Sequence, residues 1–362
     1  MPKLIRVLVV DDSSFMRKLI RDLIESDPQF QIVGEASNGR EAIEKRRALN
    51  PDVITLDVEM PIMNGMDALQ KIMAENPVPV IMLSSLTKDG TTMTVKALTL
   101  GAVDYVAKPT GAFPLDLNSV QEELIKKLKA VAGSTPPASL LAREKTHFIK
   151  MESQESPISR LLCIGSSTGG PRALQAVLSA LPKELPVPVL VVQHMPALFT
   201  ASLAERLNNV SPLRVKEAED GEQLENGTVY IAQGGWHMQV KENPHKSYVI
   251  QLDASPPIKG LKPSFDRLLE SLGPLKLPIL YTILTGMGSD GTKGLKEIKQ
   301  LTNVYALAES KETSIIYGMP KAAINSGLID QVLDLHRIAS AIVEQLTYPA
   351  VKDPPHVYEK KV

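Results

Sequence analysis

A glycine-rich turn around Ser167 is the first segment of the sequence whose residue types could carry chemistry. The run Gly165-Ser166-Ser167-Thr168-Gly169 follows an apolar segment and fits the pattern G-x-S-x-G, which presents a serine hydroxyl at the tip of a strand-to-helix turn. The dinucleotide pattern G-x-G-x-x-G fails, because Ser167 stands in place of its middle glycine. The turn is compatible with a serine nucleophile for acyl transfer. Taken alone, the motif fits a plain tight turn or a phosphate-binding loop about as well.

A serine nucleophile needs a base, and the base needs an acceptor that orients it. Of the six histidines, His194 is the best placed, because it follows the strand pattern Val189–Gln193. Asp290 lies in the glycine-rich run Thr285–Gly291, directly after another apolar run. If these strands are parallel, their ends share one edge, and a triad of Ser167, His194 and Asp290 is geometrically possible. Taken singly, a structural histidine and an Asx turn explain His194 and Asp290 equally well.

A second set of polar residues lies at the strand ends of the N-terminal third. Asp11 and Asp12 follow the first predicted strand, and Asp57 follows the third. Three converging carboxylates repel one another unless a cation neutralises them, and hard oxygen ligands suit Mg²⁺. Ser84 ends the fourth strand and Lys108 follows the fifth, which adds a hydroxyl and an ammonium. The set favours a phosphoryl group with Mg²⁺ over the alternative that Asp11 and Asp12 only cap a helix.

The elements that must position these residues follow from hydrophobic periodicity. Residues 3–130 alternate β-branched apolar runs with amphipathic stretches, which predicts five strands and five helices in a parallel, doubly wound sheet. Residues 131–157 are polar and contain Gly, Ser and Pro, as expected of an interdomain linker. Residues 158–348 predict a second α/β domain whose sheet is mostly parallel with an antiparallel hairpin over 238–252. The tail 349–362 is predicted to be disordered.

Composition excludes several classes of protein. Lys+Arg is 40 and Asp+Glu is 41, and aromatic residues make up 4%, which argues against a nucleic-acid partner. The single cysteine, Cys163, rules out an intrachain disulfide and a cysteine-based zinc cluster, and its apolar neighbours predict a buried thiol. No apolar stretch approaches the ~20 residues of a membrane span. The N-terminus runs directly into a strand pattern without a signal peptide, so a cytoplasmic location without membrane insertion is expected.

The N-terminal motifs resemble those of a known domain family. Val9–Ser13, Asp57–Pro61, Ser84 and Tyr105–Pro109 look like the signature of a two-component receiver domain. The resemblance implies that Asp57 accepts phosphate from a histidine kinase.

The same resemblance implies roles for the neighbouring residues. Mg²⁺ would be held by Asp11, Asp12, Asp57 and the Glu59 carbonyl, directly or through water. Lys108 would contact the phosphate. A switch pair would be formed by Ser84 and Tyr105, the hydroxyl moving towards the phosphate and the ring turning inward.

The C-terminal motifs also resemble a family. The Ser167 turn, Gln193–Pro196, Thr285–Gly291 and Tyr317–Pro320 are similar to the catalytic domain of the chemotaxis response regulator protein-glutamate methylesterases. That family hydrolyses glutamate methyl esters on the cytoplasmic helices of methyl-accepting chemoreceptors and releases methanol. Many members also deamidate glutamines.

The resemblance assigns roles at the second site. Ser167 would be the nucleophile, His194 the general base and then acid, and Asp290 the orienter. The N–H groups of Thr168 and Met287 are the candidates for the oxyanion hole. No cofactor is expected at this site.

Other expectations concern regulation and the limits of the match. The unphosphorylated receiver is expected to pack over the Ser167 edge and to block access, and a monomer is expected. Glu309-Ser310 stands where the family often has Gln-Asp or Gln-Asn, which puts in doubt a substrate contact there. The alternative is a receiver-controlled output domain that binds DNA, nucleotide or a partner without hydrolysis.

Overall fold

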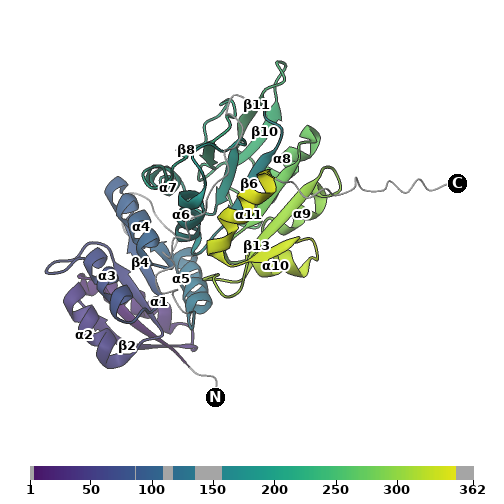
Figure 1. Cartoon of the computed structure of the whole chain (residues 1–362). Helices are drawn as coiled ribbons and strands as arrows, with labels where there is room; N and C mark the ends of the chain where they lie inside the picture. Colours follow the sequence, from purple (N-terminus) through teal and green to yellow (C-terminus); the bar gives the residue numbers. More distant parts are fainter. Residues whose placement is uncertain (1–3, 86, 109–116, 135–156, 348–362) are drawn as a thin grey trace.

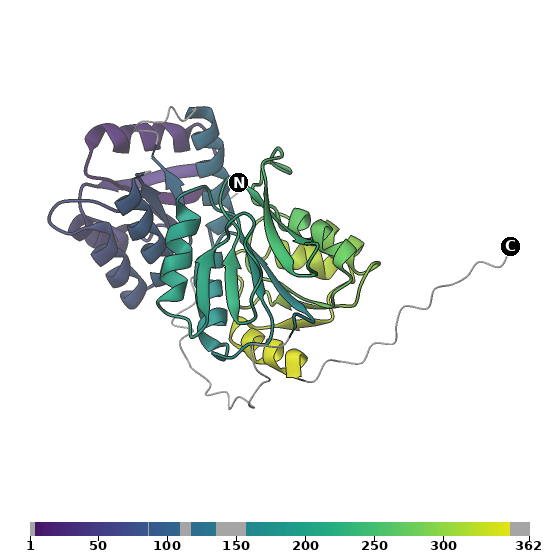
Figure 2. The same cartoon turned by 90° about the horizontal axis from the view of Figure 1, so that it is seen from above.

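The computed structural model describes residues 4–85, 87–108, 117–134 and 157–347, and it shows two α/β units side by side (Figures 1 and 2). The predicted tail lies outside these residues, as does most of the predicted linker. Among the described helices, none is both long and apolar enough to cross a lipid bilayer.

The first unit is a five-stranded sheet in the order β2-β1-β3-β4-β5, with every pairing parallel, as predicted. Its strands are β1 (Ile5–Val10), β2 (Phe30–Ala36), β3 (Val53–Asp57), β4 (Val80–Ser84) and β5 (Asp104–Ala107). Its helices are α1 (Ser14–Glu25), α2 (Gly39–Leu49), α3 (Gly65–Glu75), α4 (Lys88–Leu100) and α5 (Leu117–Val131). Val10 pairs with Leu56, so the residues that follow β1 and β3 meet at one edge.

The second unit is built on a seven-stranded sheet in the order β14-β13-β12-β6-β7-β9-β8. Its strands are β6 (Leu161–Ser166), β7 (Val189–Gln193), β8 (Arg214–Glu217), β9 (Thr228–Ile231), β12 (Ile279–Ile283), β13 (Val304–Glu309) and β14 (Gln331–Leu333). Its helices are α6 (Gly170–Ala180), α7 (Phe199–Asn208), α8 (Phe265–Leu272), the 3-10 turn η1 (Gly273–Leu275), α9 (Thr292–Ile298), α10 (Met319–Asn325) and α11 (Leu335–Thr347).

The pairings refine the prediction for this unit. All pairings in the seven-stranded sheet are parallel, and the predicted hairpin, β10 (His237–Glu242) with β11 (Tyr248–Asp253), forms a separate antiparallel sheet. The edge strands β8 and β14 were not predicted, because they are short and only partly buried. The central strands β6, β7 and β12 are buried along their whole length, which is why their apolar runs were recognisable.

The two units contact each other through α4 of the first and α6 and α7 of the second. The start of β5 also takes part, through Asp104 and Tyr105. The Gly169 N–H donates to the Val103 carbonyl at 3.1 Å, so the turn that carries Ser167 is hydrogen-bonded to the first unit. The rings of Tyr105 and Phe199 stack with centroids 4.3 Å apart. The contact between the units therefore lies at the edge where the predicted triad residues end their strands.

Candidate active site and acidic pocket

Ser167 directly follows β6, on the turn that leads into α6. Gly169 has φ 79, a left-handed conformation that favours glycine and allows the chain to turn sharply after the serine. The Ser167 N–H donates to the Thr285 carbonyl at 3.1 Å. A Cβ on Gly286 would lie 2.8 Å from the Ser167 Cβ, so the loop after β12 approaches the serine as closely as a glycine permits. Ser167 is half-buried and lines a cavity of about 450 Å³.

His194 follows β7 and lines the same cavity. Its Nε2 lies 2.8 Å from Asp290 Oδ2, and its side chain is 7% exposed. Its Nδ1 is buried and has no hydrogen-bond partner among the described residues. Because the Nε2–H donates to Asp290, the free lone pair of the neutral imidazole is on Nδ1, where it can accept a proton from another group.

Asp290 is held by the N-terminus of α8. This contact was not predicted from the sequence. Its Oδ1 accepts from the Ser264 hydroxyl at 2.9 Å and from the Asp266 N–H at 3.1 Å. Its Oδ2 accepts from the Phe265 N–H at 2.6 Å and faces His194. Burial opposes ionisation, but the bonds from His194 and the two backbone N–H groups outweigh it and hold the pKa of Asp290 below its usual value. Asp290 is therefore an ionised acceptor that fixes the His194 ring.

A second buried carboxyl, Asp266, lies next to Asp290. Its Oδ1 accepts from the Gly291 N–H at 2.9 Å and from the Gly294 N–H at 2.7 Å, which ties α8 to the loop that carries Asp290. Burial and the neighbouring Asp290 charge raise the pKa of Asp266 to about 6, so Asp266 takes up a proton at a higher pH than Asp290 does. Ser264 is the N-cap of α8, and no sequence pattern indicates that its hydroxyl bonds to a carboxylate 26 residues away.

The two predicted oxyanion residues, Thr168 and Met287, also line the cavity. Neither backbone N–H donates to an acceptor among the residues that the structure describes. Two such N–H groups beside a nucleophile can stabilise a developing oxyanion.

Glu309 is fully buried at the end of β13. Its side chain does not line the cavity but bonds to a neighbouring backbone N–H and a threonine hydroxyl. Its carboxylate accepts from the Thr285 N–H at 2.7 Å and from the Thr313 hydroxyl at 3.0 Å. Burial raises the pKa of Glu309 to about 7, and these two hydrogen bonds oppose the shift. Glu309 holds the loop whose Thr285 carbonyl accepts from Ser167, a role that the sequence did not predict.

The first unit supplies one wall of the cavity, including Asp104, Tyr105 and Lys127. The Thr168 hydroxyl donates to Asp104 Oδ2 at 2.5 Å, and Lys127 Nζ lies 3.2 Å from Asp104 Oδ1. Lys127 also donates to the Tyr105 carbonyl at 2.6 Å. A buried polar network of the first unit thus bonds directly to the residue after Ser167.

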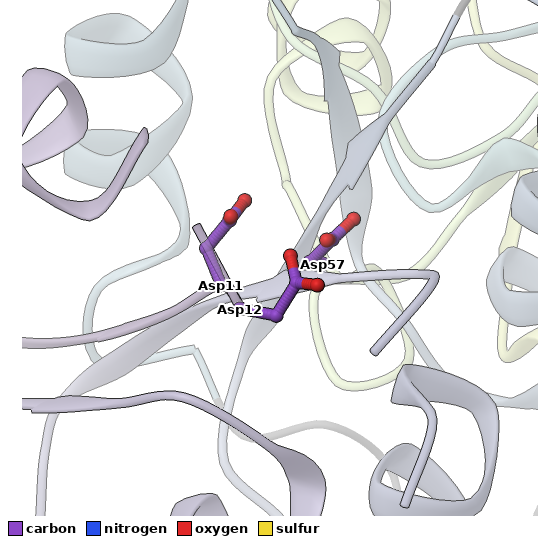
Figure 3. Close-up of side chains that lie close together, drawn as sticks. All are labelled: Asp11, Asp12 and Asp57. Atoms are coloured by element: carbon purple, nitrogen blue, oxygen red, sulfur yellow. The ribbon is translucent and has the colours of Figure 1, made fainter. Parts of the chain in front are cut away.

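The acidic residues predicted at the first sheet edge do converge (Figure 3). Asp11, Asp12 and Asp57 each place a carboxylate oxygen within 4.8 Å of the others. Lys108 Nζ lies 2.7 Å from Asp57 Oδ2 and 2.9 Å from Asp11 Oδ2. Glu59 lines the same pocket, and its N–H lies 3.5 Å from Asp57 Oδ1. The oxygen-rich donor set fits a hard divalent cation.

Asp57 is the most perturbed carboxyl of this pocket. Burial raises the pKa of Asp57 to about 6, the Lys108 ammonium opposes the shift, and the Asp11 carboxylate adds to it. A cation near Asp11 and Asp57 would therefore favour the ionised form of Asp57.

Ser84 is the last residue of β4 and Tyr105 is the second residue of β5, and the side chains of both are engaged elsewhere. The Ser84 hydroxyl accepts from Thr94 at 2.7 Å and is fully buried. The Tyr105 ring is 5% exposed and packs on Phe199 of the second unit. The hydroxyl that lines the acidic pocket is on Ser85. The proposed switch roles of Ser84 and Tyr105 stay predictions.

Comparison with known proteins gives a match for each unit. Residues 162–342 match the family "CheB methylesterase", and residues 7–116 match "Response regulator receiver domain". The "Protein-glutamate methylesterase/protein-glutamine glutaminase" of Oceanobacillus iheyensis is 49% identical over 350 residues, 95% of this chain and 99% of that protein. The protein of the same name from Bacillus subtilis is 48% identical, with 94% and 98% covered. The crystal structure of the Thermotoga maritima CheB methylesterase catalytic domain is 44% identical in sequence and superposes with a TM-score of 0.49. The match covers 51% of this chain and 97% of that chain.

Proposed function

Because this chain belongs to the CheB methylesterase family and carries a response regulator receiver domain, we propose that Ser167, His194 and Asp290 are its catalytic triad. The protein is a receiver-regulated protein-glutamate methylesterase/protein-glutamine glutaminase of chemotaxis. The observation that supports the triad most is the 2.8 Å bond from His194 Nε2 to Asp290, because it leaves Nδ1 without a described partner on a histidine that lines the same cavity as Ser167. An output domain that binds without hydrolysis is not supported.

The geometry supports acyl transfer in two balanced steps. Ser167 Oγ attacks the ester carbonyl of a glutamyl side chain, and its proton passes to His194 Nδ1. The oxyanion accepts hydrogen bonds from the N–H groups of Thr168 and Met287. The C–O bond to methanol then breaks as His194 returns the proton to the leaving oxygen. Water, deprotonated by His194, hydrolyses the acyl-enzyme, which releases Ser167 and a glutamate carboxylate. A glutamine side chain follows the same route with ammonia as the leaving group.

Asp290 supports this proton transfer in two ways. Its bond to Nε2 fixes the tautomer in which Nδ1 is free, and its charge stabilises the imidazolium formed in each step. The four donors that hold its carboxylate keep it ionised and in place. No cofactor enters this proposed chemistry.

We further propose that Asp57 is the phosphoacceptor of the receiver, which spans 3–130 and is joined by the linker 131–157 to the catalytic domain 158–348. A receiver implies a histidine kinase partner, and the acidic cluster supports a divalent metal site. Mg²⁺ would be held by the carboxylates of Asp11, Asp12 and Asp57 and by the Glu59 carbonyl, and it would neutralise the oxygens of an incoming phosphoryl group. Lys108 would contact that group.

The raised pKa of Asp57 predicts that the affinity for Mg²⁺ depends on pH. Because the pKa of Asp57 is about 6, we expect Mg²⁺ affinity to fall by up to about tenfold per pH unit as the pH drops below 6, since the metal must displace the proton. Calorimetric titration at pH 5, 6 and 7 measures this. The Asp57→Asn variant should bind Mg²⁺ more weakly and with a flatter pH dependence. Equal wild-type affinity at pH 5 and pH 7 would contradict the assignment.

The contacts at the cavity support autoinhibition by the unphosphorylated receiver. Asp104 accepts from the Thr168 hydroxyl, and Tyr105 stacks on Phe199, so the receiver both narrows the approach to Ser167 and bonds to the nucleophile turn. Phosphorylation of Asp57 would shift the population towards an open arrangement.

Removal of the Asp104 carboxylate tests this contact. Asp104→Ala loses the bond to Thr168 and the pairing with Lys127, so we expect the methanol-release rate of the unphosphorylated chain to rise roughly three- to tenfold. The added effect of a phosphodonor should shrink. The matched control is Asp22→Ala on an exposed face of α1, which should leave both rates unchanged. An unphosphorylated Asp104→Ala variant no faster than wild type would refute the inhibitory role of this contact.

The proposed function is tested by methanol release from methylated chemoreceptor, with and without acetyl phosphate and Mg²⁺. The phosphodonor is expected to accelerate release. Ammonia release from receptor glutamines tests the second activity. Absence of methanol both with and without the phosphodonor would overturn the assignment.

We also propose a cytoplasmic location and a monomer. The cytoplasmic location agrees with both proposed partners, a histidine kinase and the cytoplasmic part of a receptor.

A further inference from the structure

Two loops of the catalytic domain line the active-site cavity on the side that the receiver does not supply, and another loop packs on both of them. The first, Pro196–Leu198, directly follows Met195 and leads into α7. The second is the turn before β10 that ends at Trp236, and the third is Lys259–Lys262, which precedes α8. Pro196, Gly260, Leu261 and Lys262 line the cavity with His194. We call these three loops the substrate rim.

The three loops of the substrate rim are in contact with one another. A Cβ on Gly234 would lie 2.3 Å from the Pro196 carbonyl carbon, so the second loop packs directly on the first. The Gly235 N–H donates to the Lys262 carbonyl at 3.2 Å, and Lys262 Nζ lies 5.9 Å from the centroid of the Trp236 ring. The rim is therefore one continuous surface.

This surface exposes apolar groups that the fold does not use. Leu198 is 54% exposed and Trp236, the only tryptophan of the chain, is 39% exposed. Leu198 also has φ 74, an unfavourable conformation for a residue with a side chain. Exposed apolar residues on connected loops beside a catalytic cavity, one of them in an unfavourable backbone conformation, are typical of a binding surface.

The substrate rim is also cationic. Lys259 is exposed, and the Lys262 ammonium donates to the Ala254 carbonyl at 2.7 Å. Within the described ranges, neither lysine has a carboxylate at ion-pair distance. Two uncompensated positive charges next to an apolar cluster favour a partner that carries both carboxylates and an apolar side chain.

Resting on the proposed function, we propose that the substrate rim binds the acidic stretch of the receptor that flanks the esterified glutamate. A glutamyl side chain that reaches Ser167 in the cavity places its own backbone at the mouth, so the flanking residues must lie on the rim. Each turnover leaves a carboxylate, so neighbouring sites that have already been hydrolysed are negative and complement Lys259 and Lys262. Trp236 and Leu198 cover an apolar residue of the same stretch.

Direct binding is measured with Trp236 as the reporter, because it is the sole tryptophan. The full-length Ser167→Ala chain, treated with acetyl phosphate and Mg²⁺, is titrated with a tryptophan-free receptor peptide that contains a glutamate methyl ester between glutamates. We expect a saturable blue shift of the Trp236 emission that weakens as salt rises. Receptor-free anionic vesicles form a second arm. A shift with vesicles but not with the peptide would assign the rim to a membrane surface and overturn the proposal.

Kinetics provide the second readout, as the ratio of kcat/KM for methylated receptor to kcat/KM for N-acetylglutamate methyl ester. Trp236→Ala should lower this ratio about tenfold, as truncation of a central interface aromatic does, and Lys259→Gln should lower it less and flatten its salt dependence. Leu301→Ala and Lys241→Gln alter an exposed apolar and an exposed cationic position elsewhere and should leave the ratio unchanged. A ratio unchanged in Trp236→Ala overturns the proposal, whereas wild type inactive on both esters overturns the function itself.

Discussion

Alanine at Ser167 is expected to lower kcat for methanol release by about 10⁴- to 10⁶-fold, because a triad without its nucleophile retains only binding and oxyanion stabilisation. The fold should survive, since the half-buried hydroxyl of Ser167 makes no hydrogen bond among the described residues and the turn is held by its backbone. Single-turnover measurement of methanol release from methylated receptor, with the phosphodonor present, gives the rate. The thermal midpoint Tm should stay within a few degrees of wild type.

The neighbouring serine provides the matched control for this variant. Ser166 is buried and its hydroxyl donates to Gln193 Oε1 at 2.7 Å. Ser166→Ala should therefore lower Tm through the lost buried bond, about 1 kcal/mol, but reduce the rate by less than tenfold. If Ser167→Ala released methanol at near the wild-type rate, another residue would be the nucleophile and the triad would be wrong.

The fold could be predicted from the sequence because its central strands are buried on both faces. Apolar runs rich in β-branched residues, such as Ile5–Val10 and Val189–Gln193, are typical of strands buried in a parallel sheet, and the residues directly after such strands lie at one edge. This edge rule predicts that Asp11 lies near Asp57 and that His194 lies near Asp290. Both pairs are close together in the structure. The short edge strands β8 and β14 lack this signal because half of each faces solvent.

The support of the site could not be predicted in the same way. Ser264 and Asp266 contact Asp290 across about 25 positions of sequence, and this contact depends on how α8 packs on the loop after β12. No periodic pattern encodes such a contact. The environment of Tyr105 is also a product of tertiary packing, because its partner Phe199 belongs to the other domain. Residue types and spacing indicate the candidate catalytic groups, whereas the partners that hold those groups depend on long-range packing.

Asparagine at Asp290 is expected to lower kcat by about 10⁴-fold while leaving substrate binding largely intact. The carboxylate accepts four hydrogen bonds and donates none, so an amide must turn its NH₂ towards at least one donor. If the NH₂ faces His194, the ring accepts at Nε2 and carries its proton on Nδ1, where it can no longer take the Ser167 proton. If it faces Ser264 and Asp266, it meets the Asp266 N–H, and α8 loses the negative charge at its N-terminus.

Stability and pH separate the catalytic effect of Asp290→Asn from a structural one. The folded-state pKa of Asp290 is lowered, so its charge stabilises the wild-type fold above the ordinary value of 3.8, and this stabilisation is lost only as the pH falls through the folded value. At pH 7 the variant should therefore have a lower Tm, and the Tm gap between the two proteins should begin to narrow below pH 3.8 and close only as the pH approaches about 2. Asp266→Asn removes the adjacent carboxyl, which is protonated more readily, and should reduce kcat by less than a hundredfold. A folded Asp290→Asn chain with kcat within tenfold of wild type would show that His194 needs no carboxylate to orient it.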